Sequence, residues 1–179
     1  MTDISIRKTT VADIPAVAAI LQEGKTSIAE LGISQWQNGP YPSRVDVEAD
    51  VAAGISYLAE DETGTALGTI AITVDGDEAY DHIDGAWLTS STSEAPRYAT
   101  VHRTAVLRAA ARRGVMSALM TAAEDIARDA GCESVRVDTH PGNTPMRSLL
   151  TRCGFTLCGT ITLLKDEPDP TRVAYEKLV

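Results

Sequence analysis

The chain has 179 residues, a length that fits one domain with a core of its own. Its formal net charge is −9 at neutral pH, which argues against nucleic-acid binding, because that needs a basic face, and mildly favours a cationic substrate. The sequence has no apolar leader and no apolar run of membrane-spanning length, so we expect a cytoplasmic protein outside the membrane. The three cysteines form neither a disulfide framework nor a metal-ligand pattern, and no metal is expected.

Hydrophobic periodicity predicts the order of elements β-α-α-β-β-β-α-β-α-β-β. The expected strands cover 4–7, 56–60, 67–74, 97–106, 135–138, 155–163 and 172–177. The expected helices follow capping boxes at 10–13 and 43–46, cover 114–130, and run from Pro145 to Gly154, with a weaker helix pattern over 25–31. Residues 75–95 are expected to be irregular or to hold a short strand. The strand–helix–strand unit from 97 to 138 predicts a parallel strand pair within a mixed α/β sheet.

The strongest candidate ligand site lies where a strand ends at Val106 and a helix begins at Gly114. The first amides of a helix have no intrahelical acceptor, and the helix dipole adds positive charge, so such an end binds phosphate. Arg112 and Arg113 would add charge-assisted hydrogen bonds, and Gly114 would allow close approach of the backbone. The pattern therefore predicts an anion site, although a solvated basic loop would show the same pattern.

This stretch resembles the acetyl-coenzyme A motif of the GNAT superfamily of N-acetyltransferases, Arg/Gln-x-x-Gly-x-Gly/Ala after the fourth strand. The match runs from Ala111 to Met116. Ala111 replaces the family's Arg or Gln, and Met116 replaces its last small residue. The resemblance implies acetyl-coenzyme A as co-substrate, with cofactor contacts from Val106, Leu107, Arg108, Arg112, Arg113, Gly114, Val115, Met116 and Ser117.

A second matching stretch runs from Asp138 to Asn143 and ends in Gly154-Phe155. In GNAT proteins an Asn at this junction contacts the pantetheine arm, and we expect this role for Asn143, which is also suited to cap the helix. The whole chain is similar to a bacterial GNAT subgroup over 33–42, 101–103, 135–140 and 172–177. The resemblance implies a single GNAT domain over 1–179, with helices on both faces of a twisted sheet, as a monomer or homodimer.

Amide formation from a thioester needs a base for the amine. One face of their strand is expected to carry Tyr98, Thr100, His102 and Thr104, because side chains alternate with period two. His102 titrates near neutrality and is the first candidate base, with a structural role as the alternative. His140 is the second candidate, and it is expected with Asp138 near the same cleft.

The carbonyl oxygen and the leaving thiolate also need stabilisation. The resemblance implies that the backbone amide near Val106 serves the oxygen. Many GNAT enzymes carry a tyrosine acid in the helix before Gly-Phe, and Leu150 stands at that position here. Tyr98, Tyr41 or water are the possible substitutes.

The aromatic loop over 32–42 is the candidate wall for the acceptor. Trp36, Gln37 and Tyr41 are the expected substrate-binding residues, because Trp36 can hold a cationic amine over its ring or, alternatively, plug the core. The function predicted is acetyl transfer to a small amine or a peptide N-terminus. The alternative is a non-catalytic acetyl-coenzyme A-binding sensor or interaction module.

Overall fold

The computed structural model describes residues 4–165 and 167–179. Its strands are β1 (Ile4–Lys8), β2 (Ser56–Asp61), β3 (Ala66–Thr73), β4 (Ile83–Gly85), β5 (Tyr98–Val106), β6 (Ser134–Thr139), β7 (Thr156–Thr162) and β8 (Thr171–Leu178). Its α-helices are α1 (Ile14–Ala29), α2 (Arg44–Ala52), α3 (Val115–Asp129) and α4 (Thr144–Arg152). The predicted α/β order is confirmed, with β4 as the short strand in the region of 75–95. The separate helix predicted over 25–31 is wrong, because α1 continues unbroken through that segment to Ala29.

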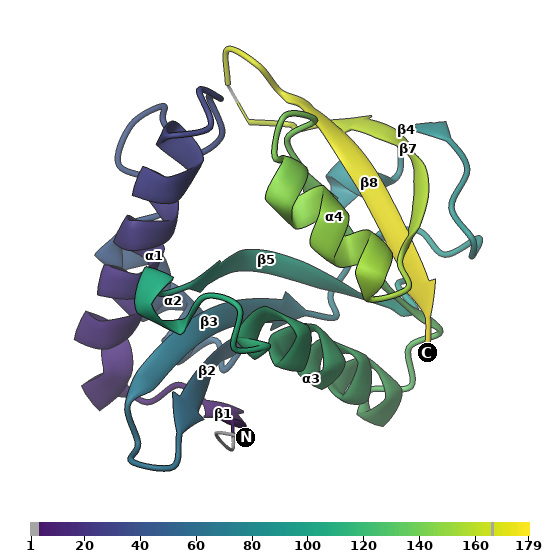
Figure 1. Cartoon of the computed structure of the whole chain (residues 1–179). Helices are drawn as coiled ribbons and strands as arrows, with labels where there is room; N and C mark the ends of the chain where they lie inside the picture. Colours follow the sequence, from purple (N-terminus) through teal and green to yellow (C-terminus); the bar gives the residue numbers. More distant parts are fainter. Residues whose placement is uncertain (1–3, 166) are drawn as a thin grey trace.

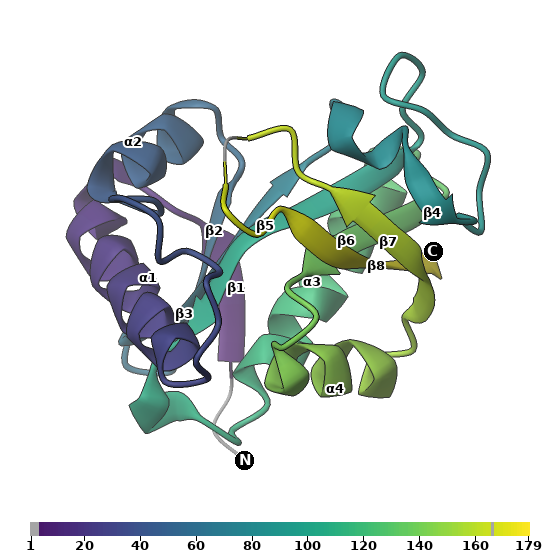
Figure 2. The same ribbon diagram turned by 90° about the horizontal axis from the view of Figure 1, so that it is seen from above.

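The strands form one mixed sheet in the order β1-β2-β3-β5-β6-β8-β7-β4 (Figures 1 and 2). Only β5 and β6 are parallel among the pairs described, which confirms the expected strand–helix–strand unit. Their pairing ends at Val101 and Val137, although β5 continues to Val106 beside β3. The two halves of the sheet diverge beyond this point (Figure 1). Peptide groups that face the gap have no partner strand, and the gap is where a ligand can meet the backbone.

Helices cover both faces of the sheet, as the resemblance implies. Helices α1 and α2 lie on one face, where Val47 and Ala105 belong to one apolar cluster. Helix α3 covers the opposite face, where Leu119 and Val101 belong to the largest cluster, and Leu150 of α4 joins the same cluster. Fully burying one such leucine contributes roughly 1.5–3 kcal/mol, so these contacts fix the helices on either side of the gap.

A bulge in β5 changes which side chains share a face. Two residues, Arg103 and Thr104, stand opposite Ile70 alone, and Arg103 has a φ of 42°. The bulge shifts the alternation, so the Thr104 hydroxyl lies 3.0 Å from the Thr69 carbonyl oxygen and 3.1 Å from Met116 Sδ of α3, its two possible acceptors. The strict alternation predicted between His102 and Thr104 is therefore wrong, since period-two spacing cannot foresee an inserted residue, although both residues line the cavity described below.

A buried ion pair fastens the segment before β5 to the sheet. Arg136 and Glu176 are fully buried, with Arg136 Nε 3.0 Å from Glu176 Oε1. The guanidinium lies 4.3 Å from the Trp87 ring centroid and 4.0 Å from that of Tyr98. Glu176 Oε1 also accepts the Thr89 hydroxyl at 2.7 Å. One carboxylate thus holds a loop and a strand together.

We expect Glu176→Gln to lower the free energy of unfolding by about 3–5 kcal/mol, because it leaves the buried Arg136 charge uncompensated. Urea unfolding measures this change. The matched control is Glu133→Gln in the exposed pair with Arg97, where a change below about 1 kcal/mol is expected. Similar losses in the two variants would contradict the assignment.

Candidate active site

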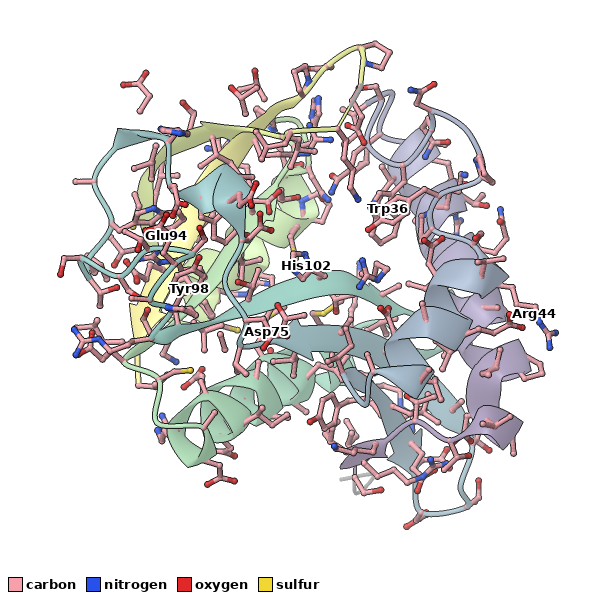
Figure 3. The ribbon with its side chains drawn as sticks, turned by 180° about the vertical axis from the view of Figure 1, so that it is seen from behind. Trp36, Arg44, Asp75, Glu94, Tyr98 and His102 are labelled. Carbon is pink, nitrogen blue, oxygen red and sulfur yellow. The ribbon has the colours of Figure 1, made fainter. Side chains whose placement is uncertain are left out.

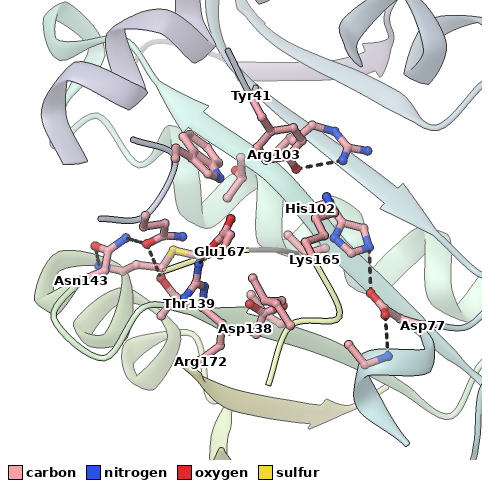
Figure 4. A pocket seen from close by; sticks show the side chains of 18 of the residues that line it. Tyr41, Asp77, His102, Arg103, Asp138, Thr139, Asn143, Lys165, Glu167 and Arg172 are labelled. Carbon is pink, nitrogen blue, oxygen red and sulfur yellow. Dashed lines mark hydrogen bonds and ion pairs between the residues drawn. The ribbon is translucent and has the colours of Figure 1, made fainter. Parts of the chain in front are cut away.

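A cavity of about 200 Å³ lies where β5 and β6 part. The loop between α1 and α2 and the loop between β7 and β8 complete its walls (Figure 4). Its polar and charged lining consists of Gln35, Tyr41, Asp77, His102, Arg103, Thr104, Asp138, Thr139, Asn143, Lys165, Glu167 and Arg172. Figure 3 places Trp36 and His102 on two sides of this space, with Tyr98 farther away.

His102 lies in the cavity wall, and its side chain is 25% exposed. Its Nε2 atom is 3.8 Å from Asp77 Oδ2, too far for a hydrogen bond. Burial, together with the positive charges of Arg103 and Lys165, lowers the pKa of His102 to about 4. The imidazole is therefore neutral at pH 7, and it is a weaker base than an ordinary histidine.

Asp138 lines the same cavity from the end of β6. Its Oδ1 atom accepts the hydroxyl of Tyr80 at 2.8 Å. Burial raises its pKa to about 6, against the lowering effects of the Tyr80 hydrogen bond and the Arg172 charge. Asp138 is thus a carboxylate at pH 7 whose basicity is higher than that of an exposed aspartate. The sequence placed it near the cleft, but its raised pKa had no sequence signal, because that pKa results from burial in the folded chain.

Two predicted catalytic residues do not line the cavity. The Tyr98 side chain is fully buried, and its hydroxyl accepts the Asp77 backbone N–H at 2.9 Å. His140 Nδ1 accepts the Gly142 N–H at 3.0 Å, and its Nε2 lies 2.7 Å from Asp169 Oδ2. Tyr98 therefore positions the segment that carries Asp77, and His140 shapes the turn between β6 and α4.

The α1–α2 loop brings two of its three predicted residues to the cavity. Trp36 and Tyr41 line it, whereas Gln37 donates from Nε2 to the Lys25 carbonyl oxygen at 3.0 Å and lies outside. Gln35 takes its place, with Oε1 accepting Asn143 Nδ2 at 3.2 Å. Trp36 has a φ of 63°, and this local reversal decides which glutamine faces inward. Composition could not separate the two.

Asn143 lies where it can both cap α4 and reach the cavity. Its Oδ1 accepts the Met146 N–H at 3.3 Å and caps α4, while its side chain also lines the cavity. Leu150 is fully buried in the apolar core, so the family's tyrosine position carries no hydroxyl. Of the two tyrosines proposed as substitutes, Tyr41 lines the cavity, with its hydroxyl accepting a hydrogen bond from Arg103 Nη1 at 3.1 Å.

After the β5 bulge, some backbone amides form hydrogen bonds within the sheet and others face the gap. Leu107 N donates to Leu67 O at 2.9 Å and is used within the sheet. Val106 lies opposite Gly68, next to that hydrogen-bonded pair, so its own amide faces away from β3 toward the gap. This orientation supports the role implied for the Val106 amide.

The start of α3 offers the expected phosphate cradle. Ala118 N donates to Gly114 O, so the preceding helical amides of Val115, Met116 and Ser117 have no intrahelical acceptor. Gly114 has a φ of 82°, and nothing lies within 4 Å of a Cβ placed there. Because the Met116 sulfur is turned inward to Thr104, the side chain does not fill the cradle. The residues present fit the phosphates of acetyl-coenzyme A.

Glu23 of α1 competes for the same segment. The Arg108 backbone N–H donates to Glu23 Oε1 at 2.6 Å, and the Arg108 guanidinium pairs with Glu30 at 2.7 Å. We expect Glu23→Gln to strengthen acetyl-coenzyme A binding several-fold, because it removes a negative charge beside an anionic ligand. Calorimetric titration measures this, with Glu48→Gln on α2 as the distant control. Weaker binding in Glu23→Gln would show that the carboxylate supports the cofactor segment.

A parallel strand pair that parts midway, with a phosphate-binding helix start and a cavity holding proton acceptors, defines the site of an acyltransferase. The sequence profile of the acetyltransferase (GNAT) family matches residues 21–155, and the chain belongs to this family. GNAT enzymes generally transfer the acetyl group of acetyl-coenzyme A. No curated protein is significantly similar in sequence.

Solved structures of the family resemble this chain over nearly all its length. An acetyltransferase of the GNAT family from Streptococcus agalactiae 2603 shares 28% identity with a TM-score of 0.86, covering 98% of this chain and 95% of that chain. One from Listeria monocytogenes 4b F2365 shares 18% identity with a TM-score of 0.72, covering 98% and 95%. A ribosomal-protein-alanine N-acetyltransferase from Brucella melitensis shares 19% identity with a TM-score of 0.68, covering 98% and 99%. The last two likenesses show the fold alone.

Across residues 4–165 and 167–179, no three His, Cys, Asp or Glu side chains are grouped so that they could hold a metal ion. Within the same residues, no helix combines the length and the apolar character needed to span a bilayer.

Proposed function

We propose that the protein is an N-acetyltransferase that moves the acetyl group of acetyl-coenzyme A to a primary amine by direct attack in a ternary complex. The observation that carries the proposal is the cavity at the parting of β5 and β6. Its wall holds the carboxylate of Asp138 and the neutral imidazole of His102. The gap also exposes the Val106 amide. One cleft thus offers a proton acceptor and an amide donor for a developing oxyanion.

Bound acetyl-coenzyme A supplies an activated thioester carbonyl to this cleft. The chain must remove a proton from the acceptor, because an alkylammonium has a pKa near ~10.4 and cannot attack. Asp138 and His102 can both accept that proton. We assign it to Asp138, since its pKa of about 6 makes it the stronger base, while that of His102 is about 4. His102 then contributes a neutral polar wall beside Asp77.

The alternative of a non-catalytic acetyl-coenzyme A-binding module draws on the buried Leu150 at the family's acid position and on Ala111 and Met116 in the cofactor motif. The missing acid does not prevent transfer, because a thiolate with a pKa near ~8.5 leaves without prior protonation. The cavity wall also holds two proton acceptors, Asp138 and His102, which a binding module does not need. The catalytic proposal therefore explains more of the residues in the cavity than the binding module does.

Release of the coenzyme A thiol, followed with a thiol reagent, tests the proposal. We expect release to accelerate when a primary amine is added, with an N-acetylated product by mass spectrometry. The Asp138→Asn variant serves as the matched control, since it keeps the size of the side chain and removes the base. Thiol release that no amine accelerates, in the presence of bound acetyl-coenzyme A, would support the binding module instead.

A further inference from the structure

We propose that the acceptor is a compact amine that fits wholly inside the cavity, and that an extended peptide is not a substrate. This inference rests on the proposed N-acetyltransferase function and chooses between the two acceptor classes that the sequence left open. Its basis is a roof over the cavity, formed by the α1–α2 loop where it contacts both the β6–α4 junction and the β7–β8 loop.

The first bridge in this roof runs from the α1–α2 loop to the β6–α4 junction. Gln35 Oε1 lies 3.2 Å from Asn143 Nδ2 and 3.4 Å from both Thr139 Oγ1 and His140 N. Beside it, a Cβ placed on Gly142 would lie 2.7 Å from Ile33 Cγ2, so the two segments are in tight contact. The direct contact between Gln35 and Asn143 leaves no room for a peptide chain between these two side chains.

The second bridge runs from the same loop to the β7–β8 loop and to β5. Lys165 Nζ lies 4.4 Å above the Tyr41 ring, a cation–π contact, and the Tyr41 hydroxyl accepts Arg103 Nη1 at 3.1 Å. Arg103 is itself fixed by Asp50, at 2.6 and 2.7 Å. Lys25 of α1 donates to the Tyr41 carbonyl oxygen at 3.1 Å and holds the loop from behind. Figure 2 shows the β7–β8 loop reaching over β5 toward this side.

The volume of the cavity limits the size of the acceptor. Pockets for drug-sized ligands measure roughly 300–1,000 Å³, and this cavity holds about 200 Å³. It therefore takes a molecule of metabolite size. A peptide would have to enter from its N-terminal residue and leave its second residue in the position of the roof.

The charge of the cavity wall determines how the amine is oriented. Asp77 lies close enough to Asp138 for its negative charge to contribute to the raised pKa of Asp138. Asp77 Oδ1 accepts the Ala79 N–H, and Asp138 Oδ1 accepts the Tyr80 hydroxyl. The Oδ2 atom of each carboxylate takes no part in these two hydrogen bonds and can accept one from an ammonium group. Lys165 brings positive charge to the roof. An acceptor with its ammonium at the two carboxylates and a neutral or acidic far end is therefore favoured over a diamine.

A length series with one reacting amine tests the inference. The probes are alaninamide and free-N-terminus alanyl peptides extended by one, two and five glycines, assayed beside a panel of compact primary amines. We expect kcat/KM to be highest among the compact amines and to fall at least tenfold once the chain exceeds two residues. Peptides used as well as the compact amines would overturn the inference and leave the proposed function intact. No amine-dependent turnover with any probe would overturn the proposed function and the inference with it.

Opening the roof provides the second test. The double variant Gln35→Ala/Lys165→Ala removes both bridges, and it is expected to raise kcat/KM for the longest peptide relative to alaninamide by about tenfold. Lys8→Ala, on the exposed strand β1, is the matched control and should leave the ratio unchanged. Unchanged acetyl-coenzyme A affinity, measured by calorimetry, verifies that the opened variant is folded. A ratio that does not move in the folded double variant would overturn the role of the roof.

Discussion

Replacing Asp138 with asparagine is expected to lower kcat by about 10²–10⁴, because a positioned general base contributes that much to rate. The carboxylate lines the cavity and is held by the Tyr80 hydroxyl at 2.8 Å, so asparagine keeps the shape and removes the basic oxygen. Acetyl-coenzyme A affinity should remain, since Asp138 lies outside the phosphate cradle at the start of α3. Steady-state kinetics and calorimetric titration together separate the loss of chemistry from the loss of binding.

The pH dependence identifies the base independently of the rate loss. Under the proposed mechanism the carboxylate form of Asp138 is the active one, and its pKa is raised to about 6. The value of kcat/KM should therefore fall tenfold per pH unit as the pH drops below about 6, and level off above it. If His102 were the proton acceptor, this acid limb of the pH profile would lie near pH 4, because the pKa of His102 is about 4. A limb near 4 that disappears in His102→Gln would transfer the role to the histidine.

The charged groups around Asp138 come from every element that packs against it. They are Tyr80 and Asp77 from the turn before β4, Arg172 of β8, Glu167 of the β7–β8 loop, and His102 and Lys165 across the cavity. Tyr80→Phe removes the hydrogen bond that lowers the pKa of Asp138, so the acid limb should move to higher pH. Activity on the plateau should change less than in Asp138→Asn. A structural role alone would lower the plateau without moving the limb.

The order of the elements could be predicted because each is specified by local signals. The capping boxes at Thr10 and Ser43 and the glycine ahead of α3 mark helix starts within a few residues. The β5 bulge at Arg103 could not be predicted, because it depends on pairing with β3 and leaves no local composition signal. Its consequence is a contact between the Thr104 hydroxyl and Met116 Sδ of α3, which period-two spacing does not predict.

The site was predicted in part for the same physical reason. The cofactor segment is contiguous in sequence, so a motif from Val106 to Ser117 could locate it. The acceptor cavity gathers side chains from distant segments, and Gln35, Asp77 and Lys165 meet there only through the tertiary fold. Single residues within a loop, such as Gln35 against Gln37, depend on backbone reversals that composition does not determine.

Arg112 and Arg113 provide the second large expected effect. Arg112→Gly combined with Arg113→Ala should weaken acetyl-coenzyme A binding tenfold or more, because charge-assisted hydrogen bonds contribute about 1.5–3 kcal/mol each. The weakening should shrink at high salt, since Arg112 and Arg113 are at the surface. Calorimetric titration at two salt concentrations measures both effects, with Arg44→Ala on α2 as the control. An unchanged Kd would mean that the helix amides alone hold the phosphates.

Glycine is the informative replacement at position 112 because of the backbone there. Arg112 has a φ of 62°, a conformation that costs a non-glycine residue about 1–2 kcal/mol, whereas alanine would keep that strain. The single variant Arg112→Gly should therefore unfold at a higher temperature than the parent while binding acetyl-coenzyme A less tightly. Arg113 pairs only loosely with Asp61, at 4.0 Å, so its replacement should leave stability almost unchanged. Stability and affinity that change in opposite directions at one residue would show that the arginine is retained for the ligand, because the fold alone is better served by glycine.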